Sequence, residues 1–90
     1  MSNKELYQQV CDKRGADAQL TVVIEELSEL AKEICKYKRG NYNLESIAEE
    51  LADVEIMCEQ LRFIFGFDYR VDEWKKAKLE RLSERINERK

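Results

Sequence analysis

The placement of three glycines in a chain without proline is the feature that most limits how this sequence can fold. The glycines are Gly15, Gly40 and Gly66, and the segments between them contain no residue that strongly interrupts a helix. In these segments apolar residues recur at intervals of three and four, which is the spacing of one face of an α-helix. The sequence therefore predicts an all-α chain of four helices.

The expected helices follow from the glycines and from capping residues. Asp17 and Asn43 have side chains suited to cap the second and third helices, and Gly66 suits a helix C-terminus. The predicted helices cover about 3–14, 17–39, 44–66 and 71–90. In the last helix, the apolar residues expected to face inward are Leu79, Leu82 and Ile86.

The third predicted helix is apolar on two sides. One stripe consists of Ile47, Leu51, Val54, Cys58, Leu61 and Phe65, and a second, roughly opposite, consists of Ala48, Ala52, Ile56 and Phe63. A helix with two apolar sides is buried on two sides, and a chain of 90 residues has a small core of its own. We therefore expect one domain over residues 1–90 that forms a helical bundle as a homodimer or homotetramer. The alternative is that the first or last helix covers the second side.

Composition limits the class of protein. The net charge of -3 gives no reason to expect a nucleic-acid partner, and the basic residues near the end of the chain alternate with Glu80, Glu84 and Glu88. No apolar run is long enough to span a membrane, and no signal peptide is recognisable, so we expect a cytoplasmic protein without a membrane partner.

The cysteines Cys11, Cys35 and Cys58 are widely spaced and form no CxxC pair, and the chain contains no histidine. This composition argues against a zinc site, because such sites are built from paired cysteines and histidines. We expect three reduced, partly buried cysteines that behave as small hydrophobic residues.

Two stretches place carboxylates beside apolar stripes. In VIEELSEL the helical spacing puts Glu26, Glu29 and Glu33 on one side, at the edge of the apolar face, with Glu25 pointing further outward. In IAEELADV, Glu50 and Asp53 lie within or beside the apolar face. If the two helices form an antiparallel hairpin, residues whose numbers sum to about 83 are level. The hairpin then brings Glu29 level with Asp53, and Glu33 with Glu50.

Converging carboxylates repel one another in a partly desolvated site unless they are protonated or neutralised by cations. Carboxylate oxygens suit a hard cation, Mg²⁺ or Mn²⁺, which retains open positions that substrate phosphates can fill. A di-iron carboxylate bundle is excluded, because it uses Glu-x-x-His motifs. A single ExxE motif is usually a solvated helix face, so only the two motifs together indicate a cation site.

The last predicted helix carries a basic stripe. Lys78, Arg81 and Arg85 share one side, with Trp74 one turn earlier. Their charges suit phosphate oxygens and a leaving pyrophosphate. The alternative is a solvated face on which the cations pair with neighbouring glutamates.

These motifs resemble the EExxE…ExxD signature of the MazG-like nucleoside triphosphate pyrophosphohydrolases, which are all-α proteins. EELSE is followed some twenty residues later by EELAD, GADAQLTVVIEELSEL resembles the G…QL…EE..EL helix of the family, and KLERLSERI resembles its closing helix. The resemblance extends over most of the chain.

The resemblance implies an oligomeric helical bundle that uses Mg²⁺ to hydrolyse (deoxy)nucleoside triphosphates to the monophosphate and pyrophosphate. The implied metal-binding and catalytic residues are Glu26, Glu29, Glu50 and Asp53. The implied substrate-binding residues are Gln19, Lys78, Arg81, Arg85 and Trp74. Glu33 lies outside the signature. The competing hypotheses are a non-catalytic helical interaction module and a nucleotide sensor that binds the same ligands without hydrolysis.

Overall fold

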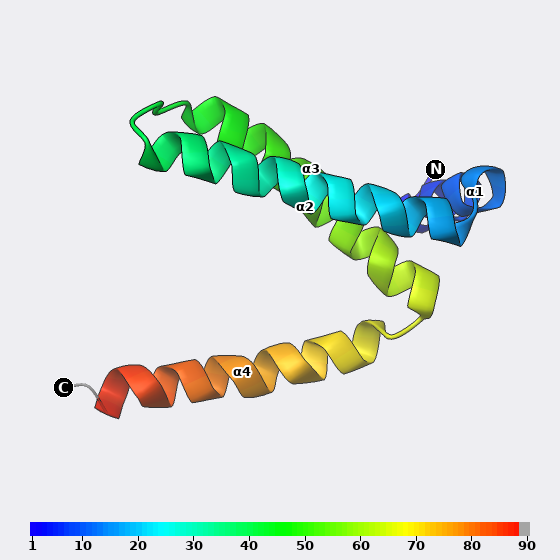
Figure 1. The fold of residues 1–90 in the computed structure, drawn as a ribbon. Coiled ribbons are helices and arrows are strands. Elements are labelled where there is room, and N and C mark those ends of the chain that lie inside the picture. The colour runs from blue at the N-terminus through cyan, green and yellow to red at the C-terminus, as the bar shows by residue number, and fades with distance from the viewer. Residues whose placement is uncertain (89–90) are drawn as a thin grey trace.

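A computed structural model describes residues 1–88 as four helices joined by short connections (Figure 1). No strand occurs in this part of the chain, so the prediction of an all-α fold is confirmed. The helices are α1 (Asn3–Arg14), α2 (Ala16–Lys38), α3 (Leu44–Phe65) and α4 (Asp68–Glu88). Among the described residues, no helix is both long and apolar enough to cross a membrane.

The ends of the helices show which local signals were decisive. Asn43 caps α3 as predicted, its side chain accepting a hydrogen bond from the Ser46 amide (3.1 Å). Gly66 ends α3 in the left-handed conformation (φ 64°), which glycine adopts without steric cost. Asp17 does not cap α2. Gly15 occupies that position with φ 88°, so α2 begins at Ala16 and Asp17 lies in its first turn, near the positive end of the helix dipole.

The two central helices, α2 and α3, form an antiparallel hairpin that holds most of the core. Val23 of α2 packs in this interface with Val54 and Met57 of α3, and each of these side chains is buried. Helix α1 lies across one end of the hairpin, where Tyr7 is buried against it. This small core places the two acidic motifs on facing helices.

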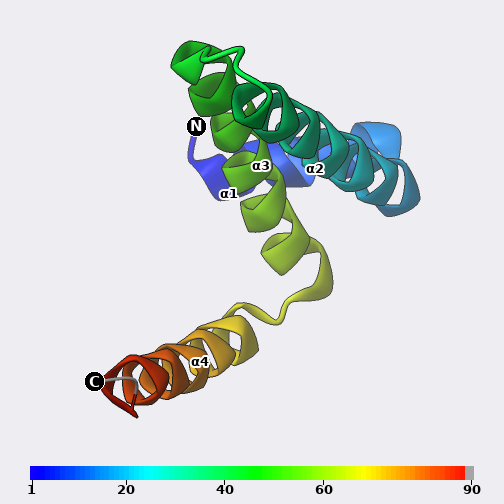
Figure 2. The same cartoon turned by 60° about the vertical axis from the view of Figure 1, so that its left-hand side comes forward.

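Helix α4 leaves the hairpin at a sharp turn and diverges from it (Figures 1 and 2). It contacts α3 and no other helix. The turn is held by Arg62, whose guanidinium bonds the carboxylates of Asp68 (2.6 Å) and Asp72 (2.9 Å). Since Asp68 is held in this way, α4 begins three residues earlier than predicted.

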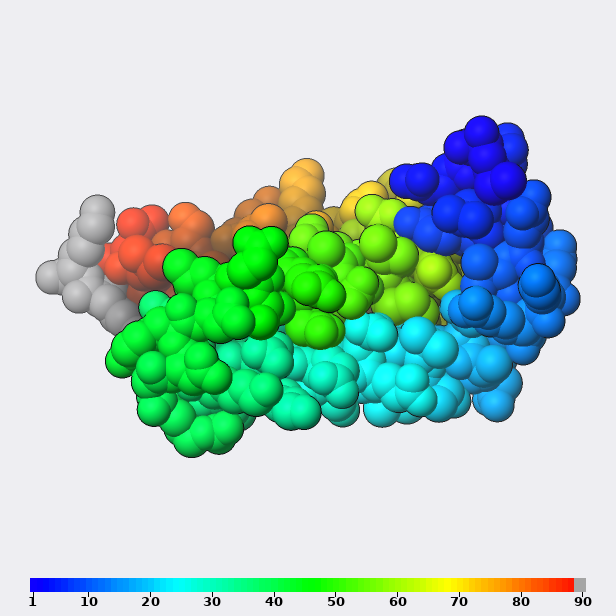
Figure 3. Space-filling model, turned by 90° about the horizontal axis from the view of Figure 1, so that it is seen from above, coloured from blue at the N-terminus to red at the C-terminus, as the bar shows by residue number. Residues whose placement is uncertain are grey.

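The apolar residues of α4 were expected to face inward, and within one chain this is wrong. Leu79, Leu82 and Ile86 are 62%, 50% and 59% exposed, because α4 extends beyond the turn without meeting another helix. The space-filling view in Figure 3 shows α4 emerging from behind α3 along its length.

The three cysteines are free, but only Cys11 is partly buried. Cys35 and Cys58 are exposed, which corrects the expectation for two of the three. Cys58 is one of the residues that line the groove between α3 and α4.

Candidate functional site

The pairing of α2 with α3 differs from the predicted register by about one helical turn. Residues whose numbers sum to 79 face each other, as Gln19 and Gln60 do. The connection between the helices causes the offset, because it folds back along the last turn of α2. The Asn41 amide bonds the Lys36 carbonyl (3.0 Å), and the ring of Tyr42 lies edge-on against Tyr37, with centroids 5.0 Å apart. Helix α3 therefore begins alongside the end of α2 rather than beyond it.

With this register, Glu26 rather than Glu29 lies opposite Asp53. Glu26, Glu50 and Asp53 each offer a carboxylate oxygen, and these oxygens all lie within 4.8 Å of one another. All three residues are half-buried, at the edge of the α2–α3 interface. We call these three residues the acidic cluster. Three of the four predicted metal-binding residues therefore come together.

Partial burial, followed by repulsion between the carboxylates, raises the pKa of two members of the acidic cluster. The pKa of Glu26 is raised mainly by partial burial, and then by the charge of Asp53 and a hydrogen bond with that residue. The pKa of Glu50 is also raised, by partial burial first and then by the charges of Asp53 and Glu26. The cluster therefore favours whatever neutralises it, either a proton or a cation.

The remaining carboxylates of the two motifs lie outside the cluster. Glu29 is exposed, but its charge contributes to the raised pKa of both Glu26 and Glu50, which places it nearby. Glu33 pairs with Lys36 one turn along the same helix (3.4 Å). Glu25 is exposed on the outer side of α2, in line with its predicted direction.

The donor atoms of the cluster fit a hard divalent cation. Ligand oxygens about 2.1 Å from a magnesium ion lie at most about 4.2 Å apart, so oxygens within 4.8 Å of one another need only small side-chain adjustments. Partial exposure of the three side chains leaves room for water and substrate oxygens on the outer side of such an ion.

Comparison of the chain with protein family models, curated proteins and solved structures gave no match.

Gln19, a predicted substrate-binding residue, is the most deeply buried of residues 1–88, at 2% exposed. Its amide nitrogen donates to the Gln60 amide oxygen (2.8 Å), and its own oxygen has no hydrogen-bond partner in the part of the chain that the structure describes. Gln60 was not singled out from the sequence. Its signal is spacing, since Gln60 follows Asp53 by seven residues just as Glu26 follows Gln19.

The predicted basic stripe lies on the exposed arm formed by α4. Lys78, Arg81, Arg85 and Trp74 are all exposed, and α4 contacts only α3, near the turn. A single chain therefore does not bring these cations to the acidic cluster.

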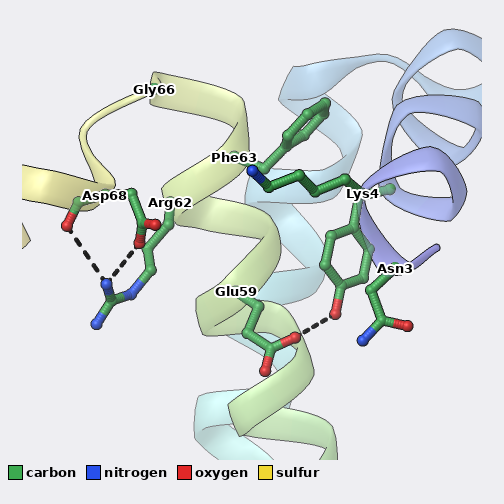
Figure 4. A pocket seen from close by; sticks show the side chains of 8 residues that line it. Asn3, Lys4, Glu59, Arg62, Phe63, Gly66 and Asp68 are labelled. Carbon is green, nitrogen blue, oxygen red and sulfur yellow. Dashed lines mark hydrogen bonds and ion pairs between the residues drawn. The ribbon is translucent and has the colours of Figure 1, made fainter.

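A cavity of about 480 Å³ lies elsewhere. It forms between α1 and the end of α3, where Lys4, Glu59 and Phe63 are among its lining residues (Figure 4). Its α3 residues point roughly 80–180° away from Asp53 around the helix axis, so the cavity does not open onto the acidic cluster. The Tyr7 hydroxyl donates to the Glu59 carboxylate at its base.

Proposed function

We propose that this protein hydrolyses (deoxy)nucleoside triphosphates to the monophosphate and pyrophosphate in a Mg²⁺-dependent reaction, and thereby removes or adjusts nucleotides in the cellular pool. The observation that carries the proposal is the convergence of Glu26, Glu50 and Asp53 from two separate motifs onto one edge of the α2–α3 interface. The resemblance of both motifs to the EExxE…ExxD signature supports the same reaction.

The side chains have distinct roles in this proposal. Glu26, Glu50 and Asp53 would hold Mg²⁺, or Mn²⁺, which when bound supplies charge neutralisation for the triphosphate. Glu29 is exposed beside the cluster, so its carboxylate can accept the proton of the attacking water. The water oxygen forms a bond to the α-phosphorus, the bond from that phosphorus to the oxygen bridging to the β-phosphorus breaks, and pyrophosphate leaves with that oxygen.

In the same proposal, assembly of several copies brings the basic stripe of α4 to the acidic cluster. Lys78, Arg81 and Arg85 match cations that would bind phosphate oxygens, with Trp74 beside them. Because α4 does not return to the cluster of its own chain, we propose a homodimer or homotetramer in which these residues reach the site of another copy. The exposed apolar side chains of α4 support this assembly.

The first experiment is pyrophosphate release from a panel of canonical and modified nucleoside triphosphates and deoxynucleoside triphosphates, with Mg²⁺ and with EDTA. Metal-dependent release of pyrophosphate together with the monophosphate is the expected result, and the panel ranks the bases. Release of inorganic phosphate, or release unaffected by EDTA, would contradict the proposed reaction.

Two other functions correspond to negative results in that assay. A nucleotide sensor would show stabilisation by Mg²⁺ and nucleotide in a thermal shift without any pyrophosphate. A non-catalytic interaction module would show neither stabilisation nor release. In each case circular dichroism of the same sample has to confirm the helical fold.

A further inference from the structure

The α2–α3 interface contains a buried polar pair beside its buried apolar residues. Gln19 and Gln60 are 2% and 8% exposed, and they are the two buried polar side chains of the described part of the chain. The Gln19 amide nitrogen donates to the Gln60 oxygen at 2.8 Å, while the buried Gln19 oxygen has no partner among the described residues. Two apolar side chains of similar shape would avoid this unpaired atom at little or no cost in stability. The pair therefore calls for a role other than stability.

A buried polar pair can fix how two helices align lengthwise. Apolar stripes alone do so weakly, because each stripe repeats every three or four residues and meets the other again after a slip of one turn. A polar pair meets itself in one alignment only, and a single buried polar residue sets the register of coiled coils for this reason.

The observed register pairs the two amides, and a register slipped by one turn does not. After a slip to the register in which residue numbers sum to 83, Gln60 would lie level with Val23, which is buried, and Gln19 with Ile64, which is half-buried. Each amide would then be buried without its partner, which is unfavourable. The connection aligns the helices at one end of the hairpin, whereas Gln19 lies about 27 Å along α2 from Tyr37, near the other end.

The same register decides which carboxylates meet. Glu26 and Asp53 each lie seven residues from one member of the amide pair, so they are level whenever the two amides are level. After the slip, Glu29 would take the place of Glu26 opposite Asp53. The acidic cluster, with its three oxygens within 4.8 Å of one another, therefore belongs to the register that the amides pair in.

We propose that Gln19 and Gln60 are positioning residues, which hold α2 against α3 in the register that assembles the acidic cluster. They act through the alignment of the helices and not by contact with substrate, because both side chains are buried. The inference rests on the proposed function for the role of the cluster as a cation site. The register itself can be measured without metal or nucleotide.

The test is the distance between spin labels on Cys35 of α2 and Cys58 of α3, measured by pulsed electron paramagnetic resonance. Both thiols are free and exposed, and Cys11→Ser removes the third one. An excess of unlabelled protein restricts the measurement to distances within one chain. Along the helix axes the two positions are about 21 Å apart in the observed register and about 15 Å apart after the slip.

Three variants of the labelled protein separate register from stability. The double leucine variant, Gln19→Leu with Gln60→Leu, removes the pair. The moved-amide variant, Gln60→Leu with Ile64→Gln, places an amide where it would face Gln19 after the slip. The control, Gln8→Leu with Gln9→Leu, makes the same two substitutions at exposed positions of α1.

We expect wild type and the control to give one distance. The double leucine variant should keep its helical circular dichroism and add a second distance, shorter by about 5 Å, the rise of one helical turn. The moved-amide variant should give mainly the shorter distance. In unlabelled protein, the rise in Tm that Mg²⁺ gives wild type should be smaller in both interface variants.

The wild-type distance alone in either interface variant, or a second distance in the control, would overturn the proposal. Loss of helical circular dichroism in the double leucine variant would contradict it as well, because the pair would then supply stability rather than register. The labelled samples contain neither nucleotide nor metal, so failure of the proposed hydrolysis would leave the distances unchanged. A wild type that does not respond to Mg²⁺ would count against the cation site, while the distances would still decide the register.

Discussion

The amide of Gln19 donates a hydrogen bond to the amide of Gln60 inside the α2–α3 interface, at 2.8 Å. The pair lies seven residues along each helix from Glu26 and Asp53, with Val23 and Met57 buried between. Along the helices, the interface thus has one polar layer on each side of an apolar layer. One polar layer is the neutral amide pair, and the other is the acidic cluster.

A double-mutant cycle on the amide pair should show strong coupling. Gln19→Leu alone leaves the buried Gln60 without its partner, and Gln60→Leu alone does the same to Gln19, so each should lower the free energy of unfolding by about 1–3 kcal/mol. The double variant removes both polar groups, including the unpartnered Gln19 oxygen, and should be close to wild type. Urea denaturation measures the cycle. Additive losses would mean that the hydrogen bond does not link these residues.

The stability of the protein without metal should fall as pH rises, whereas paired carboxylates usually make stability rise with pH. Glu26 and Glu50 have pKa values raised in the folded chain, by partial burial first and then by Asp53. The folded chain therefore binds more protons than the unfolded chain at pH values above the ordinary glutamate pKa of about 4.3, and stability falls as pH rises through that range. Without metal, the Tm should increase as pH is lowered from 7 to about 5. A Tm that rises with pH over this interval would contradict the assignment.

Removing one charge from the cluster should separate metal binding from folding. Glu50→Gln relieves repulsion and should raise the Tm at pH 7 in EDTA, while abolishing the rise in Tm that Mg²⁺ gives wild type. Pyrophosphate release should fall by more than about 100-fold. Thermal shift and the pyrophosphate assay measure both effects on the same samples.

Glu49→Gln is the matched control for this variant. Glu49 is the neighbouring residue on the exposed side of α3. The Glu49→Gln substitution removes the same charge and leaves the three oxygens of the acidic cluster in place. It should retain both the Mg²⁺ response and activity. Equal loss of the Mg²⁺ response in Glu49→Gln would indicate a diffuse ionic effect rather than a site.

Local chemistry made the helices and the two acidic motifs predictable from sequence. Asn43 and Gly66 act at the predicted ends of α3, since capping and the left-handed conformation depend on a few adjacent residues. The register was not predictable in the same way. The register depends on the connection, which folds back so that the ring of Tyr42 lies against Tyr37. The resulting offset places Glu26 rather than Glu29 in the acidic cluster.

The position of α4 also lay beyond the sequence pattern. Apolar spacing shows that Leu79 and Leu82 have a preferred side, but it does not say which surface that side meets. In the structure the turn at Gly66, fixed by the ion pairs of Arg62, directs α4 away from the hairpin. The prediction that this face is buried is therefore wrong within one chain, where Leu79, Leu82 and Ile86 are exposed.

Attachment of α1 to the hairpin should depend on one buried phenol. Tyr7 is 7% exposed, and its hydroxyl donates to Glu59 of α3, which raises the pKa of Tyr7 to about 12. Tyr7→Phe keeps the ring and removes the hydrogen bond to a charged acceptor, so the free energy of unfolding should fall by about 1.5–3 kcal/mol. Tyr69→Phe is the control, because Tyr69 is 75% exposed and should change little. Hydrogen exchange should speed up in α1 more than in α3, and equal behaviour of the two variants would show that the hydroxyl does not hold α1 in place.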